Sequence, residues 1–185
     1  AALQSQSLGY DGVVDLLPAG ITLCNAVGVH EASTAELAVG MIISEQRGFP
    51  EHFANQQTAT WNQHELIGVA GTTIIIVGAG GVGNQIADKL ASFEAHVVRV
   101  GRTGRSDSRG AVQSMDTLPS LLAKADVVAI AVPLNDETTG LVNAEFLAAM
   151  KPGALLVNVS RGKVVDTDAL VGAASAGHVR AALDV

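Results

Sequence analysis

The feature that most constrains the fold of this chain is a glycine-rich turn directly after a β-branched apolar run. The run Ile74–Val77 predicts a buried strand, Gly78–Gly83 follows it, and helical spacing then continues through Asn84–Phe93. A strand, a glycine turn and a helix in this order predict a site for the pyrophosphate of a dinucleotide. The first glycine would permit the tight turn, Gly80 would let the backbone approach the phosphates, and Gly83 would let helix and strand pack closely. The unpaired amides at the helix N-terminus would then face the anion.

Strands and helices alternate along most of the chain. Val97–Val100 closes a first strand–helix–strand unit, and the later apolar runs repeat its spacing. We expect an α/β fold with a doubly wound parallel sheet of the Rossmann type, joined by right-handed crossovers. Further strands are expected at 111–115, 127–132, 154–159 and 181–185, and helices at 118–125, 144–150 and 168–176.

The part of the chain before this pattern is less regular. Residues 1–24 are short and mixed. Ser33–Glu36 has the form of a capping box and predicts a helix that runs to about Arg47. Gly48–Pro50 would end that helix, and the polar residues 51–71 predict an irregular segment.

Composition argues against several functional classes. The chain has 185 residues, enough for about one domain, and its net charge of -7 argues against nucleic-acid binding. No apolar run is long enough to span a membrane, and the N-terminus shows no secretion signal. The single Cys24 lies among apolar residues with no metal or redox spacing, so we expect it to be buried. We therefore expect a cytoplasmic protein with no nucleic-acid, membrane or metal partner.

The residues after the second strand bear on the choice of dinucleotide. An NAD site usually has a carboxylate there to hold the ribose hydroxyls, but this chain has Gly101. Arg102, Thr103, Arg105 and Ser106 follow, and two guanidinium groups with two hydroxyls suit a 2′-phosphate. We therefore favour NADP over NAD, with Arg102 and Thr103 as candidate contacts. The alternative is an exposed basic loop on an acidic protein.

Three later segments leave the carboxyl ends of expected strands, namely Val132–Thr138, Val157–Asp166 and Ala182–Val185. Ligands of open α/β sheets bind at this edge, so all three segments can reach one crevice. Together with Gly28–Glu36 and the glycine turn, they resemble the D-isomer-specific 2-hydroxyacid dehydrogenase family. That family includes phosphoglycerate dehydrogenase and the glyoxylate/hydroxypyruvate reductases. The resemblance covers nearly the whole chain.

The resemblance implies roles for the matching residues. Arg161 matches the family's catalytic arginine, which holds the carboxylate and carbonyl oxygen of a 2-oxo acid, and a guanidinium suits that anion. The alternative for Arg161 is a surface ion pair with Asp166 or Asp168. Asp184 matches the residue that bonds the nicotinamide carboxamide, and its alternative is a strand-end aspartate that caps a turn. The other implied cofactor contacts are the amides of Gly81 and Val82, the adenosine-side residues Val132 and Pro133, Thr138 near the phosphates, and Ser160 at the nicotinamide.

The same resemblance shows what these residues lack. In the family a glutamate follows the Asp184-Val185 motif, and a histidine further on donates the proton to the carbonyl oxygen. Residues 1–24 match only the end of the family's substrate domain, with the Ser7–Asp11 turn resembling its loop for the substrate carboxylate. Residues 25–185 match its dinucleotide-binding domain. We therefore expect this chain alone to bind cofactor and to turn over little substrate.

The resulting hypothesis is the cofactor-binding portion of an NAD(P)-dependent dehydrogenase for small D-2-hydroxy or 2-oxo acids. The family pairs subunits through this domain, so we expect a homodimer built on the helix after Ser33 and on Trp61. The alternative is that this helix packs only on its own sheet. Two other classes stay open, an NAD(H)-sensing corepressor-like binding module and a Rossmann domain of unrelated chemistry such as a methyltransferase. The Asn158–Asp166 segment argues against the second.

Overall fold

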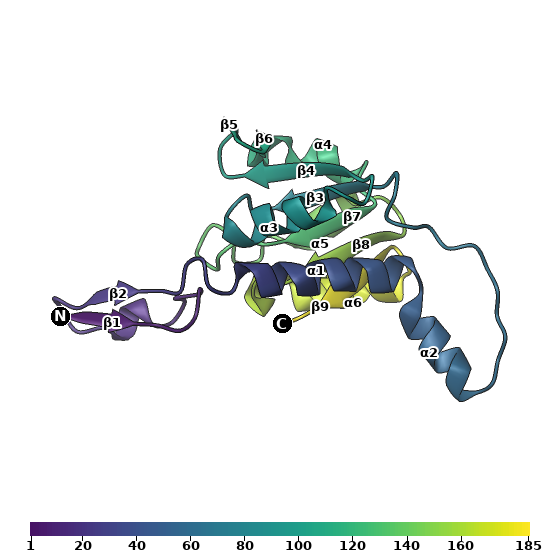
Figure 1. The fold of residues 1–185 in the computed structure, drawn as a ribbon, viewed down its shortest axis with the longest axis horizontal. Helices are drawn as coiled ribbons and strands as arrows, with labels where there is room; N and C mark the ends of the chain where they lie inside the picture. The colour runs from purple at the N-terminus through teal and green to yellow at the C-terminus, as the bar shows by residue number, and fades with distance from the viewer.

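The computed structural model describes residues 1–185, and its main body is a seven-stranded sheet with helices on both faces (Figure 1). The strands lie in the order β5-β6-β4-β3-β7-β8-β9, and only β5 runs antiparallel to its neighbour. Their bounds are β3 (Thr73–Val77), β4 (His96–Gly101), β5 (Arg105–Asp107), β6 (Gly110–Ser114), β7 (Val127–Ile130), β8 (Ala154–Asn158) and β9 (Val179–Leu183). The predicted doubly wound parallel sheet is confirmed. The order reverses beside the central β3, so the crevice of the sheet opens between β3 and β7.

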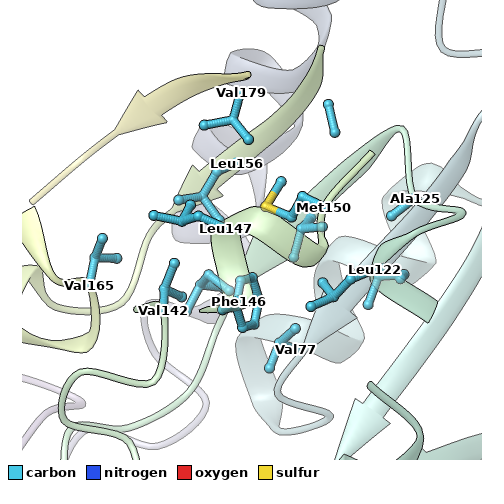
Figure 2. Close-up of a cluster of buried hydrophobic side chains, with 14 of the residues drawn as sticks. Val77, Leu122, Ala125, Val142, Phe146, Leu147, Met150, Leu156, Val165 and Val179 are labelled. Atoms are coloured by element: carbon cyan, nitrogen blue, oxygen red, sulfur yellow. The ribbon is translucent and has the colours of Figure 1, made fainter. Parts of the chain in front are cut away.

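Two hydrophobic cores lie on the two faces of the sheet, because each central strand is apolar on both sides. In β3, Ile74 and Ile76 pack toward one core while Ile75 and Val77 pack toward the other. The first core includes α1 (Glu31–Gln46) and α3 (Gly81–Leu90), and the second includes α4 (Leu118–Leu122), α5 (Ala144–Ala149) and α6 (Thr167–Ser175). Figure 2 shows the second core, where Phe146, Leu147 and Met150 fill the space beside Leu156.

The N-terminal segment forms a small unit beside this body. β1 (Ala2–Gln4) and β2 (Thr22–Cys24) pair in parallel as a separate two-stranded sheet, with a 3-10 turn, η1 (Val14–Leu16), between them. The unit extends away from the main body (Figure 1). Neither strand contains a buried residue, and Cys24 is exposed. The expectation that Cys24 is buried is therefore wrong, because a two-stranded sheet in this position has nothing packed over it.

The first long helix has a different start from the predicted one. α1 begins at Glu31 with His30 at the N-cap, and the Ser33 hydroxyl donates to the His30 carbonyl within the first turn. The capping box predicted at Ser33–Glu36 is therefore wrong. The helix ends at Gln46 as expected, but Phe49–Gln57 then form a second helix, α2. The irregular segment predicted for 51–71 is wrong as far as Gln57, since a proline favours the first turn of a new helix.

Figure 1 shows α2 and the loop after it leaving the main body before the chain returns to β3. None of the nine residues of α2 is buried. No helix in the structure combines the length and apolar character needed to cross a membrane.

The glycine turn lets α3 begin directly against the ends of β3 and β7. Gly78 has φ of +113°, and a Cβ there would lie 2.3 Å from the carbonyl oxygen of Ala131. A Cβ on Gly83 would lie 1.7 Å from the carbonyl oxygen of Gly78, so the predicted close packing of helix on strand is confirmed. The helix starts at Gly81 rather than Asn84, because the last glycines of the motif form its first turn. The later predicted elements differ from the observed ones by a few residues at their ends.

Gly83→Ala should lower the free energy of unfolding by about 1–3 kcal/mol, because the new methyl group collides with a backbone carbonyl that cannot move independently of β3. The matched control is Gly172→Ala in α6, where a Cβ meets no atom within 4 Å. That variant should gain about 0.5–1 kcal/mol from helix propensity. Urea unfolding followed by circular dichroism compares the two. Equal effects of the two substitutions would contradict the packing described for Gly83.

Candidate functional site

Two cavities open along the edge where the parallel strands end. The first, of about 660 Å³, lies between loop 6–11 of the N-terminal unit and the ends of β7 and β8. The second, of about 600 Å³, lies beside the ends of β3 and β4 and the loop after β7. Both are lined by Gly80, Ala131, Val132 and Pro133, so they meet at the glycine turn. A ligand that filled both cavities would cross the N-terminus of α3 with its middle. A dinucleotide, with two nucleoside halves joined by a pyrophosphate, has this form.

The meeting point fits a pyrophosphate. The first turn of α3 has no side-chain cap, so its amides are free to donate at the positive end of the helix dipole. A Cβ on Gly80 would meet no atom within 4 Å, so the space beside it is open to a ligand. Gly81 and Val82 line the first cavity next to it. The structure thus brings together the glycine-turn residues that were predicted to contact the cofactor.

Glu31 lies behind this turn and restricts what can occupy position 81. A Cβ on Gly81 would lie 2.7 Å from Cγ of Glu31, so a side chain there would displace the glutamate. The Glu31 carboxylate accepts a hydrogen bond from the amide of Gly28, which holds its pKa below the ordinary value. Its other oxygen, Oε2, is buried without a partner. Glu31 therefore links the start of α1 to the glycine turn. No local sequence pattern predicted this contact.

The second cavity has two arginines at its rim. Arg105 donates from Nη2 to the carbonyl oxygen of Ala79 at 2.8 Å, and its guanidinium occupies the space over Gly101. This is the place where an NAD site would carry its carboxylate. Arg102 is 82% exposed and lies 3.8 Å from Glu137, a distance typical of a weak surface pair. Thr103, the other predicted contact in this loop, lines neither cavity.

A buried arginine fixes the hairpin that carries Arg105. Arg99 on β4 is 4% exposed, and its two terminal nitrogens donate to the two carboxylate oxygens of Asp107 at 2.8 and 2.7 Å. It also donates to Asn84 of α3 and to the carbonyl of Gly110 at the start of β6. The hydrogen bond from Arg99 lowers the pKa of Asp107 to about 2. These contacts hold the β5–β6 hairpin against α3. The buried Arg99–Asp107 ion pair therefore fixes the position of Arg105, which lies on this hairpin.

Arg161 lies in the wall of the first cavity, just after β8. Its Nε donates to the two carboxylate oxygens of Asp11 at 3.1 and 3.3 Å, and its Nη1 donates to the carbonyl of Ser160 at 2.8 Å. Neither Asp166 nor Asp168, the partners considered from the sequence, pairs with it, and Asp166 instead caps α6. Arg161 therefore lies in the cleft and keeps further donors free.

The remaining predicted contacts differ in where they lie. Ser160 is buried at the cleft, with its hydroxyl donating to the carbonyl of Ile130 at 3.0 Å. Thr138 lines the second cavity and closes its turn by donating to the carbonyl of Pro133 at 2.6 Å. Asp184 is exposed and lines neither cavity, and its amide donates to the carbonyl of Asn158 at 3.0 Å. Its role at the nicotinamide stays a prediction.

Asp107 should stabilise the fold above its ordinary pKa of 3.8, and this stabilisation should be lost as the pH falls through about 2. The stabilisation is lost at low pH because Asp107 has a higher pKa in the unfolded state, so the unfolded state binds the proton first as the pH falls. Thermal unfolding between pH 7 and pH 2 tests this with Asp107→Asn, which should have a lower Tm than the wild type at neutral pH. The difference should shrink toward pH 2. A difference that does not depend on pH would contradict the charge-based account.

Comparison with known proteins shows which family this chain belongs to. The family model described as D-isomer specific 2-hydroxyacid dehydrogenase, NAD binding domain, matches residues 39–185. D-3-phosphoglycerate dehydrogenase of Mycobacterium tuberculosis is 37% identical over an alignment of 185 positions, which covers 96% of this chain and 35% of that protein. A D-isomer specific 2-hydroxyacid dehydrogenase from Xanthobacter autotrophicus Py2, solved with NADPH and MES, is similar with a TM-score of 0.89 and 29% identity, covering 100% of this chain and 60% of that chain. The NAD-dependent formate dehydrogenase of Staphylococcus aureus, solved with NAD, has a TM-score of 0.88 and 27% identity, covering 100% and 57%.

The chain spans about a third of the length of the phosphoglycerate dehydrogenase and less than two thirds of both solved chains. The matched region begins within α1 and contains the whole seven-stranded sheet, including the glycine turn and Arg161. The chain therefore belongs to the D-isomer-specific 2-hydroxyacid dehydrogenase family, and it contains that family's NAD-binding domain.

Proposed function

We propose that this chain is the cofactor-binding portion of a dehydrogenase that transfers hydride between NAD(P) and C2 of a small D-2-hydroxy or 2-oxo acid. The observation that carries the proposal is the pair of cavities that meet at the uncapped N-terminus of α3. A pyrophosphate at Gly80–Val82 directs the nicotinamide half into the first cavity and the adenosine half into the second. The relatives described above are dehydrogenases, which favours this function over a corepressor-like module.

The residues of the first cavity serve to bind and orient the acid. The cofactor, when bound, supplies or accepts the hydride. Arg161 holds the carboxylate and the C2 oxygen, which fixes the acid at one distance from the nicotinamide and stabilises negative charge on that oxygen. The hydroxyl of Ser160 donates to the carbonyl of Ile130 at the end of β7, and Ser160 would line the site of the nicotinamide.

The C2 oxygen also needs a proton donor. Of the five histidines, only His30 lines the first cavity, and its Nε2 is hydrogen-bonded to the carbonyl oxygen of Gln6 at 2.9 Å. We therefore assign the proton to the glutamate–histidine pair that the family places after the Asp184-Val185 motif.

The preferred cofactor in this proposal is NADP, with Arg105 as its main contact. Its guanidinium lies over Gly101 at the rim of the second cavity, and two of its nitrogens can reach a 2′-phosphate placed there. No carboxylate follows β4 directly to repel that phosphate. Arg102 and Thr103 are secondary contacts, because Arg102 is mostly exposed and Thr103 lies outside the cavity lining.

Titration of the chain with NADH and NADPH, followed by nicotinamide fluorescence, tests the proposal. We expect NADPH to bind more tightly. Arg105→Gln should weaken NADPH about 10-fold or more and NADH less than about 3-fold, because a charge-assisted hydrogen bond to phosphate is lost. Arg102→Gln, the matched control in the same loop, should have a smaller effect on NADPH. If Arg105→Gln lost equal affinity for NADPH and NADH, Arg105 would not be the contact for the 2′-phosphate.

The location of the pyrophosphate needs a separate control. Gly80→Val fills the open space beside the helix N-terminus without touching any protein atom within 4 Å of its Cβ. It should leave the Tm of the free chain unchanged and abolish the binding of both cofactors. Normal binding by this variant would mean that the coenzyme lies elsewhere.

We also propose that residues 1–24 belong to the substrate domain of the full-length protein. Their two-stranded sheet packs on nothing in this chain, and loop 6–11 still reaches the first cavity. A substrate domain that continues from them would cover this cavity and exclude water from it. A cytoplasmic location stays a prediction from the sequence.

The proposed assembly is a homodimer formed through α1, α2 and the loop after α2. Phe49 and Phe53 of α2 and Trp61 of the loop are exposed, Trp61 at 89%. Phe49 and Phe53 lie on a helix with no buried residue, so packing on another molecule would bury apolar surface that this chain leaves exposed. A second copy, related by a two-fold axis, would offer it the same helices.

Sedimentation velocity at micromolar concentration should show a dimer. The double variant Phe53→Glu with Trp61→Glu should sediment as a folded monomer, because two charges would be buried in the interface. Val171→Glu is the control, since Val171 is an equally apolar, 58% exposed residue on α6 at the other face of the sheet. A monomeric wild-type chain, or a dimer that survives both charges, would refute this arrangement.

A further inference from the structure

We propose that Asp11 is a positioning residue that holds the Arg161 guanidinium ready for the acid. The inference rests on the proposed function, since it concerns the same acid-binding arginine. It assigns a role in the cleft to a carboxylate of the N-terminal unit, which lies 150 residues from Arg161 in the sequence.

The donors of Arg161 show why the pair leaves room for an acid. A guanidinium has five N–H donors. The one on Nε is used by Asp11, and one on Nη1 is used by the carbonyl of Ser160. Three remain, one on Nη1 and two on Nη2, and one of the Nη2 donors lies on the same edge as Nε while the other two point away from Asp11. A carboxylate can be held by the donors that point away from Asp11, so the Asp11 pair and the acid occupy different edges of the guanidinium.

The backbone of loop 6–11 is fitted to the same guanidinium. A Cβ on Gly9 would lie 1.7 Å from Nη2 and 2.8 Å from Cζ of Arg161, so the arginine lies directly against the loop. Loop 6–11 is itself tied to the segment between β2 and α1, because Asn25 donates to the carbonyl of Leu8 at 2.8 Å. The amide of Ala26 donates to the carbonyl of Ser7 at 3.1 Å. Asp11 therefore presents its carboxylate from a fixed frame, not from a loose terminus.

The pair is poorly suited to a purely stabilising role. The side chains of Arg161 and Asp11 are 39% and 32% exposed, and ion pairs that water reaches contribute little to the free energy of folding. What the pair does fix is the rotamer of a long side chain. Without Asp11, Arg161 would lose its rotamer freedom only when the acid binds. The entropic cost of fixing the side chain would then weaken the binding of the acid.

The test is oxamate binding to the NADPH-loaded chain by isothermal titration calorimetry, with oxamate as an unreactive 2-oxo acid analogue. Asp11→Ala should weaken oxamate about 10-fold. Asp11→Asn should recover part of this loss, because its amide oxygen still accepts from Nε. NADPH affinity and Tm should stay unchanged in both variants. Asp15→Asn, a carboxylate of the same unit in η1 with no ion-pair partner, is the matched control and should behave as the wild type.

Four results would overturn the inference, and they are separable from failure of the proposed function. If Arg161→Gln loses oxamate while Asp11→Ala binds it as the wild type does, the acid site stands and Asp11 has no positioning role. Tighter oxamate binding by Asp11→Ala would show that Asp11 competes with the acid. Parallel losses of oxamate affinity, NADPH affinity and Tm would reduce Asp11 to a structural contact. If the wild-type chain and Arg161→Gln are alike toward oxamate, the acid-binding role of Arg161 fails, and the inference fails with it.

Discussion

The close approach of α3 to the ends of β3 and β7 is the contact on which the rest of the structure depends. It exists because two backbone positions, Gly78 and Gly83, have no side chain where a carbonyl oxygen already lies. The approach brings the first turn of the helix to the point where the strand order reverses. Both cavities share this turn, so the free amides of one short helix serve as the centre of the whole cleft. A side chain at Gly78 or Gly83 would push α3 away from the strands. The first turn of the helix would then no longer lie between the two cavities.

Around that centre, each end of the cleft is held by an arginine–aspartate pair with a different degree of burial. Arg99 is almost completely buried and binds Asp107, Asn84 and Gly110, so it fixes the β5–β6 hairpin to the body of the domain. Arg161 is partly exposed and binds Asp11 of the N-terminal unit as well as the carbonyl of Ser160. The difference has a functional meaning. In the proposed function, the cofactor end is built within the sheet, whereas the acid end depends on a segment outside it, which would suit a site that must admit and release a substrate.

The sequence was informative where a pattern is local. The strand–glycine–helix motif predicted the anion site because its geometry is set within about ten residues, and the alternation of apolar runs predicted the parallel sheet. The errors fall where contacts with distant residues decide the outcome. Ser33 could have capped a helix, but α1 extends back to Glu31, whose carboxylate accepts from the amide of Gly28. Cys24 looked like a core residue, but β2 has no layer over it. Residues 51–57 looked polar and irregular, and they belong to a helix in which no residue is buried.

The sequence by itself determined the fold class, the place of the phosphate turn and the presence of Arg161 at the end of a strand, because strand and helix periodicity and the glycine motif depend on neighbours along the chain. Tertiary structure decided which groups meet. It paired Arg161 with Asp11 and not with the nearby Asp166, placed Arg105 over Gly101 while leaving Arg102 in solvent, and kept Asp184 outside both cavities. The physical reason is that a charged side chain takes the partner that the packed backbone brings within hydrogen-bond distance, and that distance is set by how the layers pack, which no spacing in the sequence records.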